Sequence, residues 1–140
     1  MIIYLDTSSF VKLYIEEAHS EAVRRWVEEA EIPATCRIAY PEMISALNRR
    51  LKQGDISRKE YNLLTAKLFK EWTDFAVIDF NEIEAGNLID KYGLRGFDAV
   101  NLSAAKLLKD EQGDIALSFS SFDEKLNKAA SSEGFTILSP

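Results

Sequence analysis

Short apolar runs alternate along the chain with longer segments in which apolar residues recur every three or four positions. The apolar runs fall at residues 2–5, 32–36, 75–80, 115–119 and 135–138. Runs of this length are typical of buried strands, and the spacing in the longer segments is typical of helices with one apolar face. Strands that alternate with helices predict parallel crossovers and therefore an α/β fold, a three-layer α/β/α sandwich around a mainly parallel sheet.

Capping residues and apolar stripes place the expected helices. Helices are expected from residue 8 or 9 through 15, from about 41 to 52, from 97 or 98 to near 113, and from 123 to 132, with further helices that begin at 20, 57 and 81. Ser57 and Glu60 form a capping box. The helix after this box carries a stripe that we expect to be core or dimer surface, and not a platform for bases: Tyr61, Leu64, Leu68 and Trp72.

The chain is predicted to form one domain over residues 1–140, because it contains no repeat, no low-complexity stretch and no linker rich in proline or glycine. No apolar run approaches the roughly 18 residues that a membrane span needs. The N-terminus lacks the basic start of a signal peptide. We therefore expect a cytoplasmic protein that does not associate with membranes.

The composition narrows the chemistry that the chain can support. With one cysteine and one histidine, it can form neither an internal disulfide, nor a Cys/His zinc cluster, nor a pair of catalytic histidines. A hydrolase built from this chain must rely on carboxylates, which are hard ligands suited to Mg²⁺ and Mn²⁺. The net charge of −6 argues against binding nucleic acid through overall charge, but it permits an acidic cleft that needs a divalent cation before a phosphate can approach.

Two acidic residues in the N-terminal half of the chain are candidates for such a cleft. Asp6 follows the first expected strand directly, at the edge of a parallel sheet where ligands bind. An aspartate there is also a common N-cap, although Ser8 or Ser9 could cap the helix instead. Glu42 lies in the first turn of its expected helix, where the helix dipole alone would favour a glutamate.

Two further acids lie in the C-terminal half. Asp98 and Asn101 are polar exceptions on a nearly apolar helix and share a face at positions i and i+3, and buried polar residues need a partner or a ligand. Asp123 follows an apolar run, although a capping box between Ser121 and Glu124 would explain the acids there.

The arrangement of the acids matters more than any one of them. If the strands before Asp6 and Asp123 are parallel neighbours, their carboxyl edges coincide, and Asp98 opens the helix that leads into the later strand. The carboxylates would then converge. Like charges so close repel each other, and a divalent metal would resolve the repulsion and activate water for attack on a phosphodiester.

Four segments in this order resemble the motifs of the PIN-domain ribonucleases, in particular the VapC-type toxins of type II toxin–antitoxin systems. The segments are IYLDTSSFVKLY at residues 3–14, PEMISALNRR at 41–50, FDAVNLSAA at 97–105 and SFDEKL at 121–126. In the last segment Ser121 stands where the family usually has threonine, which keeps the hydroxyl group. The similarity spans essentially the whole chain.

The resemblance implies a PIN-like endoribonuclease that depends on Mg²⁺, with Mn²⁺ as an alternative, and that cleaves RNA with metal-activated water. It implies these catalytic residues and metal ligands: Asp6, Glu42, Asp98 and Asp123. The side chains expected to support them are Ser8, Asn101 and Ser121. It also implies a homodimer and a cognate antitoxin protein that blocks the groove. Basic residues that could hold the RNA backbone, or simply form a solvated helix face, are Lys12, Arg49 and Arg50.

Other classes of function are weighed against this one. A PIN-like fold could serve as a non-catalytic interaction module, or as a nuclease that processes RNA without being a toxin. Phosphoryl transfer through an aspartate, as in haloacid-dehalogenase-like folds, is disfavoured because Ser8 stands where that pattern has its second aspartate. The receiver-like pattern is disfavoured because residues 119–121 offer no lysine.

Overall fold

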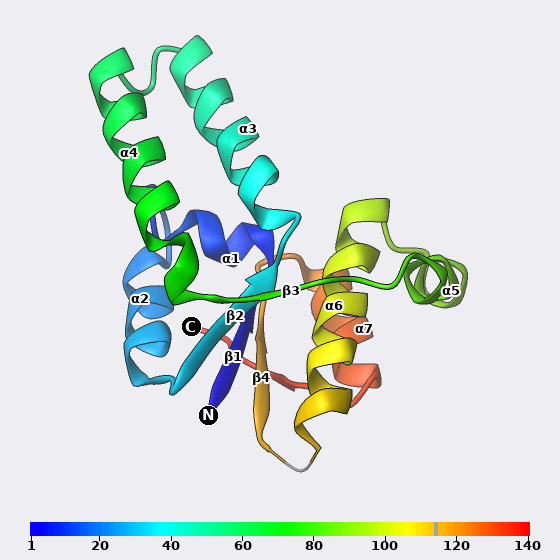
Figure 1. Cartoon of the computed structure of the whole chain (residues 1–140). Helices are drawn as coiled ribbons and strands as arrows, with labels where there is room; N and C mark the ends of the chain where they lie inside the picture. Colours follow the sequence, from blue (N-terminus) through cyan, green and yellow to red (C-terminus); the bar gives the residue numbers. More distant parts are fainter. Residues whose placement is uncertain (114) are drawn as a thin grey trace.

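The computed structural model describes residues 1–113 and 115–140, and it shows a five-stranded, all-parallel sheet between two layers of helices (Figure 1). The strands are β1 (Ile2–Leu5), β2 (Ile32–Cys36), β3 (Ala76–Ile78), β4 (Leu117–Ser120) and β5 (Thr136–Ile137). The helices are α1 (Thr7–Val11), α2 (Ser20–Glu29), α3 (Ala39–Lys52), α4 (Arg58–Glu71), the 3-10 helix η1 (Trp72–Asp74), α5 (Glu82–Tyr92), α6 (Gly96–Gln112) and α7 (Glu124–Ser132). The predicted α/β class and three-layer sandwich are confirmed.

The order of the strands creates a crevice at one edge of the sheet. The order is β3-β2-β1-β4-β5, so the chain moves outward from β1 in one direction and later returns to its other side. Leu5 pairs with Thr35 of β2 and with Ser120 of β4, which brings the carboxyl ends of all three strands together. Helices α1–α4 cover one face and α5–α7 cover the other (Figure 1). Ligands bind at such a switch point in parallel sheets.

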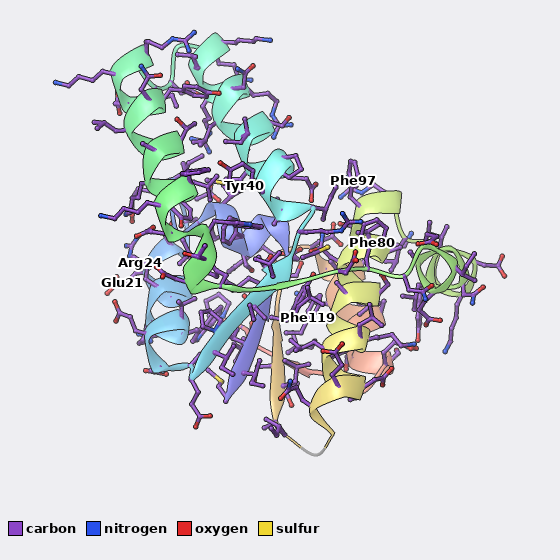
Figure 2. All side chains as sticks on the ribbon, viewed as in Figure 1. Glu21, Arg24, Tyr40, Phe80, Phe97 and Phe119 are labelled. Carbon is purple, nitrogen blue, oxygen red and sulfur yellow. The ribbon has the colours of Figure 1, made fainter. Side chains whose placement is uncertain are left out.

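The alternation of side chains along β1 divides the core between the two faces of the sheet. Ile3 and Leu5 pack with α1–α4, whereas Ile2 and Tyr4 pack with α5–α7. Tyr4 stacks on Phe119 of β4 with 5.5 Å between ring centroids, and Figure 2 shows Phe119 between the sheet and α6. The stripe on α4 that was expected to be core or dimer surface packs into the first of these clusters, on the α1–α4 face.

Helices α3 and α4 form a hairpin that projects beyond the carboxyl edge of the sheet (Figure 1). The predicted capping box starts α4, since the Ser57 hydroxyl accepts from the NH group of Glu60 and the Glu60 carboxylate accepts from that of Ser57. Over residues 1–113 and 115–140, no helix combines the length and the apolar character needed to cross a membrane.

One expected helix is shorter than its apolar pattern indicated. The helix predicted to reach residue 15 ends at Val11. Beyond it, the NH groups of Leu13 and Tyr14 bond to carbonyl oxygens three residues earlier, which produces tight turns. These turns carry Tyr14 and Ile15 into the core, so tertiary packing decides the end of the helix.

Candidate active site

Asp6 lies at the switch point of the sheet and is only 3% exposed. Its Oδ1 accepts a hydrogen bond from the NH group of Ser9 at 3.0 Å and from the hydroxyl group of Ser8 at 2.7 Å. Its Oδ2 accepts from the hydroxyl group of Ser121 at 2.6 Å. The prediction that Ser8 or Ser9 could cap α1 in place of Asp6 is wrong, because Asp6 itself is the N-cap and the Ser8 hydroxyl donates to it.

Burial raises the pKa of the Asp6 carboxyl to about 6, from an ordinary value of 3.8. Loss of hydration is the largest cause, because the charged form loses most when water is excluded. The charge of Asp98 raises the pKa further, while the hydrogen bonds from Ser121 and Ser8 lower it. The buried surroundings of Asp6 therefore disfavour its charged form and favour neutralisation of the carboxylate by a proton or a cation.

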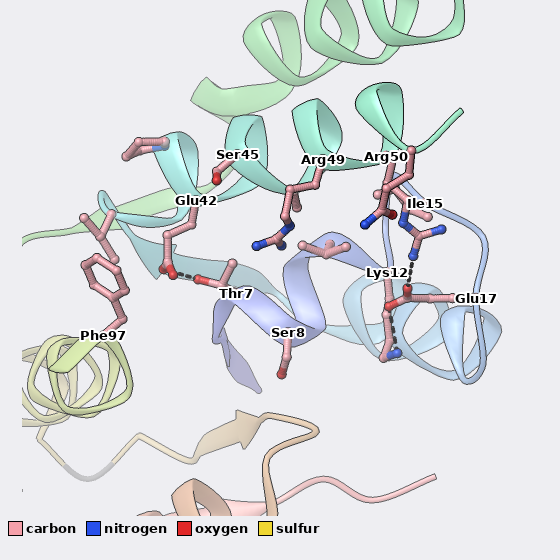
Figure 3. Close-up of a pocket in the computed structure, with 15 residues that line it drawn as sticks. Thr7, Ser8, Lys12, Ile15, Glu17, Glu42, Ser45, Arg49, Arg50 and Phe97 are labelled. Atoms are coloured by element: carbon pink, nitrogen blue, oxygen red, sulfur yellow. Dashed lines mark hydrogen bonds and ion pairs between the residues drawn. The ribbon is translucent and has the colours of Figure 1, made fainter. Parts of the chain in front are cut away.

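Glu42 reaches the same crevice from the first turn of α3. The Thr7 hydroxyl donates to Glu42 Oε1 at 2.5 Å, a bond that joins α1 to α3 (Figure 3). Burial raises the pKa of Glu42, the Thr7 hydrogen bond opposes this, and the charge of Asp98 raises it further. Thr7 was not among the predicted site residues, because its place beside Asp6 in the sequence suggests only a capping role.

Arg95, which was also not predicted, lies between Asp98 and Asp123. Its Nε is 3.3 Å from Asp98 Oδ2, and its Nη2 is 3.2 Å from Asp123 Oδ2. The pKa of Asp98 is raised by burial and by the charge of Asp123, and the guanidinium group opposes the rise. The spacing of Arg95 and Asp98 at i and i+3 was a signal for the first contact, but nothing in the sequence indicates the second.

Ser121 links two of the acids. While its hydroxyl group donates to Asp6, its oxygen accepts from the NH group of Asp123 at 3.0 Å. The N-cap of α7 is Asp123, whose Oδ1 accepts from the NH group of Leu126 at 2.8 Å. The predicted capping role of Ser121 with Glu124 is therefore wrong, because Ser121 precedes the cap and holds the carboxylates instead.

Asn101 holds α6 against the sheet. Its Oδ1 accepts from the Tyr4 hydroxyl at 2.9 Å, and its Nδ2 donates to the carbonyl oxygen of Phe97 at 3.1 Å. Since Tyr4 lies two residues before Asp6 and Phe97 lies one residue before Asp98, these bonds fix the two acids relative to each other. Asn101 therefore helps to position Asp6 and Asp98 relative to each other without being one of the acids itself.

One hollow of about 400 Å³ is lined by all four predicted acids. Ser8, Asn101 and Arg95 also line it. Over the part of the chain that the structure describes, no three His, Cys, Asp or Glu side chains are arranged so that they could hold a metal ion. The guanidinium of Arg95 bonds to two of the four acids in this arrangement. The donor set is nevertheless the one that Mg²⁺ and Mn²⁺ prefer, so the residues fit such an ion in their chemistry.

A groove of about 640 Å³ extends from the acids along α1 and α3 (Figure 3). All three predicted basic residues line it. Glu17 bonds to Lys12 Nζ at 2.9 Å and to Arg50 Nη2 at 3.0 Å. Lys12 is buried, with Nζ 4.5 Å from the centroid of the Phe122 ring, so a solvated helix face does not describe it. Arg49 lines the groove and the acidic hollow, and forms no ion pair with any other described residue.

Comparison with known proteins identifies the family. The PIN domain model matches residues 3–131. Ribonuclease VapC46 of Mycobacterium tuberculosis is 30% identical over 138 residues, which cover 99% of this chain and 97% of the relative. FitAcB from Neisseria gonorrhoeae has a similar structure, with a TM-score of 0.71 and 18% identity over 99% of this chain and 97% of that one. A toxin–antitoxin complex from Klebsiella pneumoniae gives a TM-score of 0.68 and 14% identity over 99% and 97% of the two chains. The chain belongs to the PIN domain family.

Proposed function

We propose that this chain is an endoribonuclease that depends on Mg²⁺ or Mn²⁺, and that it is the toxin of a toxin–antitoxin pair. The observation that carries the proposal is the convergence of four carboxylates, from four separate segments, on one hollow at the switch point of the sheet. The ribonuclease named VapC46 supports the activity. The toxin–antitoxin complex of the same fold supports the partner.

The four carboxylates have different roles in this proposal. Asp6 and Asp98 are the principal metal ligands, and Glu42 and Asp123 complete the site. The metal, when bound, supplies an activated water and neutralises charge on the phosphodiester. Hydroxyl groups of Ser8 and Ser121 hold both oxygens of Asp6, and hydrogen bonds of this kind orient a ligand and tune its basicity.

The basic groove provides a path for the RNA backbone toward the acids. Arg49 is available to a phosphate, whereas Lys12 and Arg50 share the carboxylate of Glu17. Because the groove leads into the acidic hollow, an antitoxin segment that filled it would block access of RNA. We further propose that the chain acts in the cytoplasm and forms a homodimer. Sedimentation of the purified chain at several concentrations would test the dimer.

Cleavage of RNA by the purified chain tests the function directly. A mixture of cellular RNAs is incubated with Mg²⁺, with Mn²⁺ or with EDTA, and the products are separated on gels. We expect cleavage with either metal and none with EDTA. Cleavage that persists in EDTA contradicts the metal-dependent mechanism, and a protein that binds Mg²⁺ but cuts no RNA would be a non-catalytic module.

Replacing Arg95 with alanine should strengthen metal binding. The guanidinium bonds to Asp98 and Asp123, so an incoming cation must displace it. We expect the Kd for Mg²⁺, obtained from the rise in melting temperature with Mg²⁺ concentration, to fall by about tenfold. This is a change of about 1.4 kcal/mol in binding free energy. Arg24→Ala is the matched control, because Arg24 pairs with Glu16 away from the site. A metal response that is unchanged or weaker in Arg95→Ala contradicts the competition.

Replacing Thr7 with valine should slow cleavage without weakening RNA binding. Valine keeps the shape of threonine but cannot donate to Glu42, whose carboxylate then loses its fixed orientation. We expect about a tenfold lower single-turnover rate at saturating RNA, since a hydrogen bond to a charged group such as the Glu42 carboxylate contributes about 1.5 kcal/mol. Thr65→Val on α4 removes a hydroxyl that bonds to the carbonyl oxygen of Asn62 in its own helix, and it should cleave normally. Equal rates in Thr7→Val and the natural protein would show that Glu42 needs no such support.

A further inference from the structure

A second, apolar hollow lies beside the acidic one, where α5, the start of α6 and the residues after β3 meet. Its volume is about 660 Å³. Phe80 and Phe97 both line it, and Figure 2 shows them near each other where α6 begins. Phe97 is 60% exposed and Ile89 is 39% exposed, so apolar surface is open to solvent. Concave apolar surface beside a few polar groups is typical of a ligand site.

The apolar hollow is continuous with the proposed catalytic site. Glu42, Arg95 and Asp98 line both hollows. Phe97 directly precedes Asp98 in the first turn of α6, and in Figure 3 its ring lies on the side of Glu42. A molecule that rests on the Phe97 ring is therefore next to the carboxylates that act on a phosphate.

Neighbouring residues hold the ring of Phe80 and the backbone of Phe97. The guanidinium carbon of Arg37 lies 5.2 Å from the centroid of the Phe80 ring, and Arg37 Nε bonds to Asp79 Oδ1 at 2.6 Å. The carbonyl oxygen of Phe97 accepts from Asn101, which fixes the turn that presents its ring. Because the Phe80 ring and the Phe97 backbone are fixed before binding, less conformational entropy is lost when a flat ring stacks there.

We propose that this hollow binds one unpaired base of the RNA, which stacks on Phe97 beside the phosphate that is cut. This inference rests on the proposed ribonuclease function and names the form of RNA that the site takes. A nucleobase has apolar faces for the aromatic rings and a polar edge, whose amino groups can donate to Glu42 or Glu82 at the rim. A paired base has both faces covered by its neighbours, so the inference favours single strands and loops.

A second copy of the chain is a poorer occupant. A twofold contact places the same patch of each copy against the other. The carboxylates at the rim, from Glu42, Glu82 and Asp98, outnumber the one guanidinium group there, from Arg95, so two copies of the patch would bring an excess of negative charge together, which opposes association. One base carries no net charge and avoids this conflict.

Three variants alter the hollow. Phe97→Ala removes the stacking surface, and Phe97→Trp restores a larger one. Gly86→Leu fills the space instead, because Gly86 of α5 lines the hollow, and a Cβ there would meet no atom within 4 Å and so would not clash. Matched controls are Phe69→Ala, which removes a ring that is 74% exposed on α4, and Asn87→Leu, which adds the same side chain to α5 at an exposed position outside the hollow.

The probes are short single-stranded RNAs that each carry one fluorescent adenine analogue, whose emission falls when it stacks. Binding is measured with Ca²⁺ in place of Mg²⁺, and gels verify that the RNA stays intact. We expect quenching with the natural protein and with Phe97→Trp. Phe97→Ala and Gly86→Leu should lose the quenching and bind about tenfold more weakly, as expected for one stacked base. The two controls should bind normally, and all variants should keep the Mg²⁺ response in thermal melts.

Equal affinity and quenching in the natural protein, Phe97→Ala and Gly86→Leu would overturn the base site, even if the natural protein cleaves RNA. The same result with altered sedimentation of the two variants would assign the hollow to a second copy of the chain. Equal binding of the annealed duplex and the single strand would also overturn the inference. Failure of the natural protein to cleave any RNA overturns the nuclease function separately, since it is measured in Mg²⁺ and not by fluorescence.

Discussion

Asp98→Asn is expected to cleave RNA about a thousandfold more slowly than the natural protein, a loss of about 4 kcal/mol of transition-state stabilisation. Asparagine keeps the size of the side chain but removes its charge. The charge of Asp98 raises the pKa of both Asp6 and Glu42, so it is coupled electrostatically to the other acids of the hollow. A cation bound there would interact with all of them. Single-turnover rates at saturating Mg²⁺ and RNA measure the effect.

A matched control separates this effect from a general change in charge. Asp90→Asn removes one carboxylate from an exposed position on α5 that lines neither hollow, and it should cleave RNA at the natural rate. Asp98→Asn should also lose most of the rise in melting temperature that Mg²⁺ produces, because a ligand stabilises the folded state only when its concentration exceeds Kd, and a weaker site raises Kd. Cleavage by Asp98→Asn within tenfold of the natural rate would contradict its role as a principal metal ligand.

Most of the fold was predictable because burial imposes a clear pattern on this sequence. The central strand β1 is buried on both faces, so residues 2–5 form a continuous apolar run that a surface loop would not contain. The start of α4 is encoded by its capping box, a local signal that the structure reproduces. The length of α1 was not predictable, because its apolar residues continue past Val11 and only packing of Tyr14 and Ile15 ends the helix.

The acids of the candidate site were predictable, but the contacts that join them to residues in distant segments were not. Asp6 and Asp123 each follow an apolar run, and parallel pairing of β1 with β4 places them at one edge. The bond from Thr7 to Glu42 joins residues 35 positions apart, and the bond from Arg95 to Asp123 joins residues 28 apart. Each such contact depends on side-chain directions in two separate segments, and no local pattern in a single sequence carries that information.

The same crevice should make Asp6→Asn more stable than the natural protein when no divalent cation is present. Asp6 is buried, and its pKa of about 6 exceeds the ordinary value of 3.8. At 1.36 kcal/mol per pKa unit, its ionisation costs the folded state up to about 3 kcal/mol at neutral pH. Asparagine removes this charge, and its amide can still accept from the NH group of Ser9 and donate to Ser121.

The direction of the pH dependence follows from the raised pKa. Between about pH 4 and pH 6 the folded chain binds more protons at Asp6 than the unfolded chain does, so the stability of the natural protein falls as the pH rises through this range. The raised pKa values of Glu42 and Asp98 act in the same direction. Asp6→Asn lacks the largest of these contributions. Urea unfolding in EDTA across this range should show a gain in stability that vanishes near pH 4 and is largest above pH 6.

Saturating Mg²⁺ should reverse the order of the two proteins at neutral pH. A cation offsets the desolvation of the charged carboxylate and binds an amide weakly, so the natural protein gains about 4.1 kcal/mol at a metal concentration roughly 1,000 times Kd while Asp6→Asn gains little. The crossing of the two stabilities separates a metal site from a structural cap, since a cap loses stability on substitution with or without Mg²⁺. If Asp6→Asn proved less stable than the natural protein at neutral pH in EDTA, the hydrogen bonds of Asp6 would outweigh its burial. In that case the pKa of Asp6 would not lie above its ordinary value, and the crevice would not hold a charge for a cation to neutralise.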